Sequence, residues 1–207
     1  MKEEIQKFFK GDAEDSEETL KKYSHDASIF DIRPRVVLYP KDSEDVQNLV
    51  KWVSENTEKY HGLSITARCA GTDMSGGAVG ESIILDFTRY MNKLISFEGD
   101  KITVEPGMFY RDFEKITLEK GLILPCFTAS KTINAMGGMF GNNSAGERTL
   151  KYGKTEDYIV ETKVVFADGS LKVVKSIPLS EVSGKGEYYT KLNGLIENNK
   201  EEIRLAK

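Results

Sequence analysis

Two stretches of the chain combine glycine with small polar residues, a composition from which ligand-binding backbone is often built. Nine of the 18 glycines fall within Gly71–Gly80 and Gly137–Gly153. Glycine has no side chain, so its backbone can approach another group closely and adopt conformations that other residues avoid. The pattern therefore indicates chemistry carried by backbone groups.

The first stretch reads Arg68-Cys-Ala-Gly-Thr-Asp-Met-Ser-Gly-Gly-Ala-Val-Gly80. Successive N–H groups in such a loop can converge into a nest that binds anions, phosphate above all. Thr72 and Ser75 add hydroxyl donors, and Arg68 either neutralises phosphate or forms a structural ion pair. A P-loop is excluded because Gly77-Ala78 stands where its lysine and hydroxyl residue would be, and no GxGxxG motif occurs.

The second stretch reads Met136-Gly-Gly-Met-Phe-Gly-Asn-Asn-Ser-Ala-Gly146, with Tyr152-Gly153 following. Asn142, Asn143 and Ser144 can donate and accept hydrogen bonds toward the polar edge of a ring, and Tyr152 can stack or donate. Two such loops suggest two walls around one extended ligand with phosphate in its middle. Plain structural turns are the alternative.

No catalytic residue or metal site is indicated by the sequence. The two histidines, His25 and His61, lie outside both stretches. Cys69 and Cys126 form no CxxC pair and no metal-ligand spacing. We expect both cysteines to be small buried residues with inert thiols.

The charge pattern limits the possible partners. The 207 residues carry 29 Lys and Arg against 33 Asp and Glu, and residues 1–31 alone hold 5 Lys against 9 acidic residues. This distribution argues against a nucleic-acid binder, which shows a basic footprint. No 18-residue apolar run and no signal core occur, so we expect no membrane span, no export and a cytoplasmic location.

The elements expected around these stretches alternate between strand and helix. An acidic helical arm interrupted at Asp12–Ser16 comes first. A small βαβ unit then follows from strand patterns and from an apolar stripe with helical spacing. Its parts are a strand at Val36–Tyr39, a helix capped by Asp42 or Ser43 with Val46, Leu49, Val50 and Val53 on one face, and strands at Leu63–Ala67 and Ser82–Asp86.

The second half of the chain predicts hairpins, helices and turns. They are a hairpin around Gly99-Asp100, a helix from Phe109 to Gly121, a short strand at Leu122–Leu124, a helical turn within Met136–Gly146, a hairpin around Asp168-Gly169 and a helix over about Glu187–Lys200. The fold class is α+β with two lobes: an arm over 1–31, a small βαβ lobe over 32–92 and a larger mixed-sheet lobe over 93–207, with the ligand between the lobes.

Several spaced motifs resemble one family. Arg68-x-x-Gly-Thr-x-x-Ser-Gly-Gly77 with Ile84-Leu-Asp86 resembles the pyrophosphate loop of FAD-linked oxidases of the vanillyl-alcohol-oxidase or p-cresol-methylhydroxylase type. Gly137-Gly-Met-x-x-x-Asn-Ser-Ala-Gly146, Lys151-Tyr-Gly-Lys-Thr155 and Ala167-Asp-Gly169 are similar to that family's second FAD loop and later strands. The resemblance covers residues 23–175, nearest to the glycolate oxidase D-subunit and D-lactate dehydrogenase group.

The resemblance implies one FAD that is extended between the lobes. The pyrophosphate would be held by the backbone of eight residues: Ala70, Gly71, Thr72, Asp73, Met74, Ser75, Gly76 and Gly77. The flavin and ribityl side would be lined by Pro125, Gly137, Gly138, Asn142, Asn143, Ser144, Gly146, Tyr152 and Gly153. Ile159 and Val160 would lie near the adenine. Relatives that link FAD covalently carry His after the glycines, so Thr72 implies non-covalent FAD.

The implied reaction is oxidation of a D-2-hydroxy acid of the lactate or glycolate class by hydride transfer to flavin N5. The resemblance further implies a substrate domain that these residues lack, and a possible electron-acceptor protein as partner. Two alternatives stay open. One is a non-catalytic flavin-binding or subunit-assembly module, and the other is a fragment of an NADPH enzyme similar to UDP-N-acetylenolpyruvoylglucosamine reductase.

Overall fold

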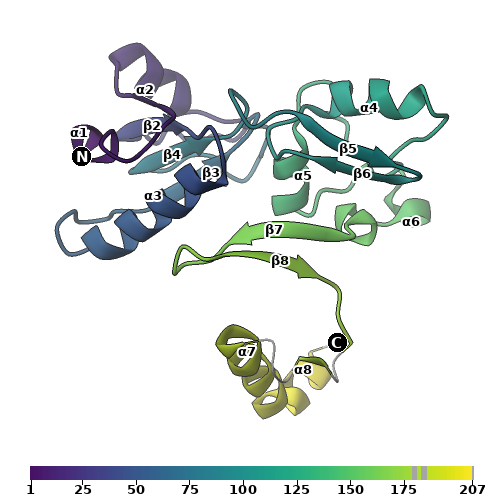
Figure 1. The fold of residues 1–207 in the computed structure, drawn as a ribbon. Coiled ribbons are helices and arrows are strands. Elements are labelled where there is room, and N and C mark those ends of the chain that lie inside the picture. The colour runs from purple at the N-terminus through teal and green to yellow at the C-terminus, as the bar shows by residue number, and fades with distance from the viewer. Residues whose placement is uncertain (179–180, 183–185, 207) are drawn as a thin grey trace. The chain divides into compact units, whose positions relative to one another are not determined.

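A computed structural model describes residues 1–178, 181–182 and 186–206. The chain divides into two compact units, one of Met1–Ile159 with Lys163–Lys172 and the other of Val160–Thr162 with Val173–Lys207. Helices and strands are mixed along the chain (Figure 1), which confirms the α+β class. No helix of the described residues is both long and apolar enough to cross a membrane.

The first unit contains a four-stranded sheet in the order β1-β2-β4-β3 (Figure 1). The strands are β1 (Asp12–Glu14), β2 (Val36–Tyr39), β3 (Ile65–Arg68) and β4 (Ile83–Asp86). Strand β4 pairs in parallel with β2 and with β3, whereas β1 pairs antiparallel with β2. The predicted βαβ unit is confirmed, since α3 (Ser43–Asn56) follows β2.

Alternate residues of β2 pack into two different cores, because successive side chains of a strand point to opposite faces. Val36 and Leu38 pack with Leu49 of α3. Val37 and Tyr39 pack on the other face with Leu20 and Tyr23 of α2 (Glu17–Tyr23). Helices therefore cover both faces of the sheet, as is usual for parallel strands.

The acidic N-terminal segment joins this core at several points. Ile5 of α1 (Lys2–Ile5) is fully buried in the same cluster as Leu49. The expected break at Asp12–Ser16 contains strand β1, which the sequence did not predict. The Asp45 carboxylate accepts the backbone N–H of Lys10 at 2.7 Å and that of Lys41 at 2.9 Å, so it ties the segment to the start of α3.

Residues 93–159 form a hairpin and short helices around a separate core. The elements are β5 (Leu94–Glu98), β6 (Lys101–Val104), α4 (Tyr110–Leu118), α5 (Met136–Gly141), α6 (Thr149–Tyr152) and the 3₁₀ helix η1 (Thr155–Tyr158). Their core consists of Met108, Tyr110, Phe113 and Met139. The predicted hairpin around Gly99-Asp100 and the helix after Phe109 are confirmed.

Two predicted features of this half are wrong. Leu122–Leu124 forms no strand, because its backbone closes α4 instead: Leu122 N–H donates to Thr117 O and Tyr110 Oη donates to Leu124 O, both at 3.0 Å. The larger lobe also lacks the expected mixed sheet within the described residues. The chain between β6 and β7 (Glu161–Val165) forms helices and turns, so β5–β6 and β7–β8 (β8 is Leu171–Lys175) remain separate two-stranded sheets.

The β7–β8 hairpin turns at Gly169, which has a φ of +75°, as the Asp168-Gly169 signal predicted. Within the first unit, the side-chain amide of Gln47 on α3 donates to Gly169 O at 2.9 Å. The second unit contains α7 (Glu187–Asn198) and α8 (Lys200–Leu205). Helix α7 confirms the predicted helix at Glu187, and its apolar residues Leu192 and Leu195 are exposed.

Candidate functional site

The first glycine segment, residues 68–80, leaves the carboxyl end of β3 and leads into β4. Ligands of open α/β sheets commonly bind beyond the carboxyl ends of parallel strands. Gly71 and Gly76 have φ values of +68° and +86°, a region that favours glycine. These two residues allow the tight course of the loop.

Two backbone N–H groups of this segment bind a carboxylate, and that carboxylate belongs to the chain itself. The Asp73 carboxylate accepts the N–H of Gly77 at 2.5 Å, the N–H of Ser75 at 3.3 Å and the Ser75 hydroxyl at 2.9 Å. These hydrogen bonds, that from Gly77 first, hold the pKa of Asp73 below its usual value. The donors of the loop thus bind a carboxylate, so their chemistry fits an anion.

Protein side chains fill the space beside each glycine of this segment. A Cβ on Gly71 would collide with the Arg68 guanidinium. A Cβ on Gly76 would lie 2.5 Å from the Phe30 ring, and a Cβ on Gly77 would lie 2.6 Å from Asp73 Oδ2. The positive φ values of Gly71 and Gly76 make these two glycines necessary for the conformation of the loop itself.

Arg68 is partly buried, and among the described residues no carboxylate lies within ion-pair distance of its guanidinium. It stacks over the Tyr23 ring at 5.0 Å from the centroid and donates to Ala78 O at 3.1 Å. Burial lowers the pKa of Arg68. Of the two roles considered for Arg68, an ion pair has no support here, and a cation beside the loop suits phosphate.

The second glycine segment forms α5 and the turns after it. Gly137 N–H donates to Pro106 O at 2.7 Å, and a Cβ on Gly137 would lie 2.6 Å from Pro106 Cβ. A Cβ on Gly146 would collide with Phe127 O. In contrast, a Cβ on exposed Gly138 would meet only Cys69 Cβ, at 3.9 Å. Gly138 thus leaves a space that a side chain would fill.

The two segments meet at Cys69, although they lie far apart in the sequence. The Cys69 thiol donates to Pro106 O at 3.4 Å and lies beside the backbone amide of Gly138. Burial raises the pKa of this thiol to about 12, so it stays protonated at neutral pH. Both features agree with an inert thiol that joins the two segments.

The polar residues predicted at the ring edge form hydrogen bonds with one another and with the start of η1. Asn143 has a φ of +45°, and its Oδ1 accepts the backbone N–H of Glu156 at 3.0 Å. The Asn142 amide donates to Ser144 Oγ at 3.1 Å, and Thr155 Oγ1 donates to Ser144 O at 2.7 Å. These contacts fix the course of the loop that ends α5.

The remaining predicted residues lie near this loop, with one exception. Pro125 precedes Cys126, which is buried and lies 3.9 Å from Thr155 Oγ1. Tyr152 O accepts the Tyr158 hydroxyl at 2.8 Å. Ile159 belongs to the first unit and Val160 to the second, and the place of both beside the adenine remains a prediction.

A segment that the sequence analysis did not single out, residues 24–32, covers the outside of the first glycine segment. Ala27 N–H donates to Gly71 O at 3.0 Å, and Ala78 N–H donates to Asp26 Oδ2 at 3.3 Å. Phe30 adds its ring contact with Gly76. These pairings join distant positions, and no local sequence signal indicates them.

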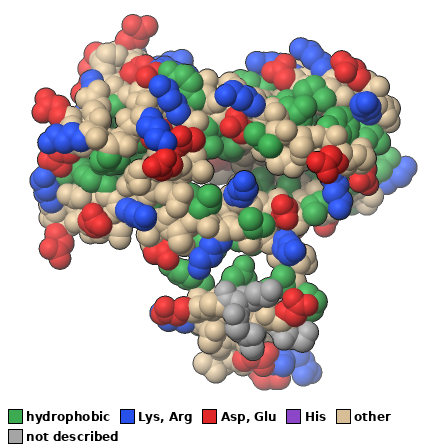
Figure 2. Space-filling view, viewed as in Figure 1, with side chains coloured by type: hydrophobic (Ala, Val, Ile, Leu, Met, Phe, Trp, Pro, Cys, Tyr) green, Lys and Arg blue, Asp and Glu red, His purple; other side chains and the backbone are tan. Residues whose placement is uncertain are grey.

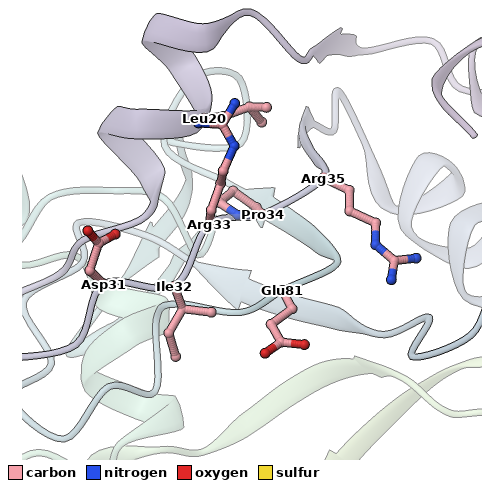
Figure 3. A pocket seen from close by; sticks show the side chains of 7 residues that line it. All are labelled: Leu20, Asp31, Ile32, Arg33, Pro34, Arg35 and Glu81. Atoms are coloured by element: carbon pink, nitrogen blue, oxygen red, sulfur yellow. The ribbon is translucent and has the colours of Figure 1, made fainter.

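A surface groove lies elsewhere, at the residues preceding β2 and β4 (Figure 3). Its lining combines two arginines and two carboxylates with three apolar residues: Leu20, Asp31, Ile32, Arg33, Pro34, Arg35 and Glu81. Arg33 binds Glu17, and Arg35 donates to His61 O at 3.0 Å. Lys and Arg side chains also alternate with Asp and Glu over the face seen in Figure 2. Neither surface selects a ligand of one charge.

Comparisons with known proteins identify the family of the chain. A family model described as "FAD binding domain" matches residues 34–175. D-2-hydroxyglutarate dehydrogenase of Escherichia coli (strain K12) is 28% identical over 189 residues, which are 89% of this chain and 18% of that protein. Glycolate oxidase subunit GlcD of Bacillus subtilis (strain 168) is 31% identical over 153 residues, which are 72% of this chain and 32% of that protein.

Solved structures share the fold. Alkyldihydroxyacetonephosphate synthase aligns with a TM-score of 0.71 at 20% identity, over 84% of this chain and 37% of that one. The 6-hydroxy-D-nicotine oxidase of Arthrobacter nicotinovorans aligns with a TM-score of 0.68 at 23% identity, over 84% and 38%. The chain thus spans about a fifth to a third of the two curated relatives. Since the family model covers more than half of the sequence, the chain belongs to the FAD-binding domain family of FAD-linked oxidases.

Proposed function

We propose that FAD binds where the two glycine segments meet, and that the chain is the cofactor-binding part of an oxidoreductase acting on a D-2-hydroxy acid. The observation that carries the proposed site is the junction at Cys69. Cys69, which leads into the first glycine loop, lies beside Gly138, and the side-chain direction of Gly138 is nearly free of protein atoms. A phosphate nest beside an open backbone surface suits a ligand with a pyrophosphate and a flat ring.

The proposed contacts follow the two segments. The backbone of Ala70–Gly77 holds the pyrophosphate, with the Arg68 guanidinium as a nearby cation. The flavin and ribityl side lies along Gly138 and the loop through Asn143 and Ser144, with Pro125 and Tyr152-Gly153 beside it. Ile159 and Val160 are proposed near the adenine. The hydrogen bonds of Asn143 and Thr155 keep this wall rigid before a ligand arrives.

The proposed substrate class comes from relatives named D-2-hydroxyglutarate dehydrogenase and glycolate oxidase subunit. Bound FAD supplies the redox chemistry, acceptance of a hydride at N5 from the carbon that carries the substrate hydroxyl. The two glycine segments bind and orient the cofactor. Neither contains a histidine, so we propose that the proton acceptor and the cation for the substrate carboxylate come from outside them, as does the electron acceptor.

We also propose that FAD is held without a covalent bond. Thr72 stands where covalent attachment would use a histidine, and His25 and His61 lie outside both segments. Cys69 and Cys126 are free thiols, which suits the reducing cytoplasm as the proposed compartment.

An absorption spectrum of the purified chain tests these proposals. We expect flavin bands near those of free FAD, and release of all the flavin into the supernatant on acid precipitation. A folded chain that stays colourless after FAD is added would contradict the proposed site. Flavin that remains with the acid precipitate would contradict only the non-covalent assignment.

A further inference from the structure

We propose that Asp73 is an internal competitor for the FAD pyrophosphate: its carboxylate occupies the phosphate-binding N–H groups in the flavin-free chain and has to leave them when the cofactor binds. The inference rests on the proposed assignment of Ala70–Gly77 to the pyrophosphate. In this proposal a single side chain, that of Asp73, controls how tightly the protein binds FAD.

The donors that hold Asp73 are those a phosphate would use. Gly77 N–H lies 2.5 Å from Oδ2, and Ser75 presents both its N–H and its hydroxyl to the carboxylate. Glycine at position 77 is what admits the carboxylate, because a Cβ there would lie 2.6 Å from Oδ2. The position that the Asp73 carboxylate occupies is thus formed by the loop's own geometry.

The charge of Asp73 is balanced by the loop donors. Among the described residues, no Lys or Arg lies within ion-pair distance of its carboxylate. The hydrogen bonds from Gly77 and Ser75 also hold its pKa low, so the group remains charged at neutral pH. A pyrophosphate reaching the same donors would therefore meet a like charge in contact with them, and like charges at such distances repel.

The carboxylate can move away without disturbing the core. Asp73 is partly exposed, its neighbours Met74 and Ser75 are exposed, and Met74 is 81% exposed. A rotation of the Asp73 side chain would take the charge into water and free the N–H groups of Ser75 and Gly77. The competing explanation is that Asp73 permanently stabilises the loop, and that the FAD pyrophosphate binds to hydrogen-bond donors other than those of Ser75 and Gly77.

The two explanations predict different changes in FAD affinity when the Asp73 carboxylate is removed. The test uses the 207-residue chain stripped of flavin, with Asp73→Asn, which removes the charge and keeps the shape, and Asp73→Ser, which shortens the side chain. The FAD dissociation constant is measured by quenching of flavin fluorescence, and the thermal midpoint of each flavin-free variant is measured separately. Asp100→Asn, in the turn between β5 and β6, makes the same change of charge away from the loop.

For an internal competitor, we expect both Asp73 variants to bind FAD about tenfold more tightly and to melt at a lower temperature without flavin. Asp100→Asn should change neither value. Unchanged or weaker FAD binding in both Asp73 variants overturns the proposal and shows that Asp73 only stabilises the loop. If the unmodified chain binds no FAD, the proposed site fails first, and this inference fails with it.

Discussion

The two glycine segments have similar compositions, but their glycines serve different physical purposes. In residues 68–80 the glycines make room for side chains of the same chain, namely those of Arg68, Phe30, Asp73 and Thr66. In residues 136–146 they make room for backbone and a proline, and Gly138 alone of the proposed contacts there faces open space. A glycine-rich motif therefore does not show by itself which glycine touches a ligand.

This difference predicts separate outcomes for the same kind of substitution. A side chain added to the first segment should disturb the fold of the loop and, through it, the cofactor. A side chain added at Gly138 should disturb the cofactor alone. Measuring FAD binding and stability on the same variants separates the two cases.

The largest effect is expected for Gly76→Val, which combines a φ of +86° with a contact to the Phe30 ring. We expect the free energy of unfolding to fall by about 3 kcal/mol and FAD binding to be lost. Denaturant unfolding and flavin fluorescence provide the two measurements. Gly99→Val is the control, because Gly99 also has a positive φ, +63°, but has nothing within 4 Å. It should lose less stability and keep FAD binding.

Gly138→Val should weaken FAD binding about 100-fold while the thermal midpoint of the flavin-free chain stays close to that of the parent. The physical reason is the open space beside Gly138, which the new side chain would fill in place of the ligand. The matched control is Gly141→Val in the same helix, where a Cβ also meets nothing. Equal FAD affinity in both variants would show that the ligand does not approach Gly138.

Arg68→Met should weaken FAD binding about tenfold and reduce the dependence of binding on salt, because the loop would lose its nearest cation. Titrations at two salt concentrations measure both effects. Arg111→Met is a suitable control, since Arg111 likewise stacks on a ring, Phe109, and donates to a backbone oxygen, that of Thr132. A loss of affinity equal to that of the control would mean that Arg68 acts only through packing.

The smallest effect on the cofactor is expected for Cys69→Ser, since the thiol is a neutral contact between the segments. In the folded chain the pKa of Cys69 is about 12, above its ordinary value. As the pH rises past 9, the thiol loses its proton in the unfolded state but keeps it in the folded state. The contribution of this thiol therefore makes the free energy of unfolding fall as the pH rises from about 9 to about 12. Alkylation at pH 8 should be slow until the chain unfolds; fast labelling of Cys69 in the folded chain would contradict this account.

Local signals sufficed to predict much of the fold. The apolar spacing and the Asp42 cap located α3, and Gly99-Asp100 located the β5–β6 hairpin, because helix spacing and turn geometry depend on neighbouring residues. Strand β1 was missed, since Asp12–Glu14 is polar and becomes a strand only by pairing with Val37–Tyr39. Leu122–Leu124 was misread because its apolar residues close a helix.

For the site, sequence reasoning found the two segments but not their junction. The contact of Cys69 with Pro106 and Gly138 joins three separate parts of the chain, and no local pattern reports such contacts. The anion nest was predicted, yet its occupant was not. Asp73 lies within the predicted loop, and its carboxylate accepts the N–H of Gly77, four residues later, so the short spacing of these two residues is the signal that indicates the contact.

The cover that residues 24–32 place on the loop has a consequence for where this domain begins. The family model begins at residue 34, yet Asp26 and Ala27 hydrogen-bond to the backbone of Ala78 and Gly71. The matched residues 34–175 thus leave out residues that hydrogen-bond to the first glycine loop. A chain that begins at residue 34 would keep both glycine segments and still lose the hydrogen bonds that Asp26 and Ala27 make to the first glycine loop.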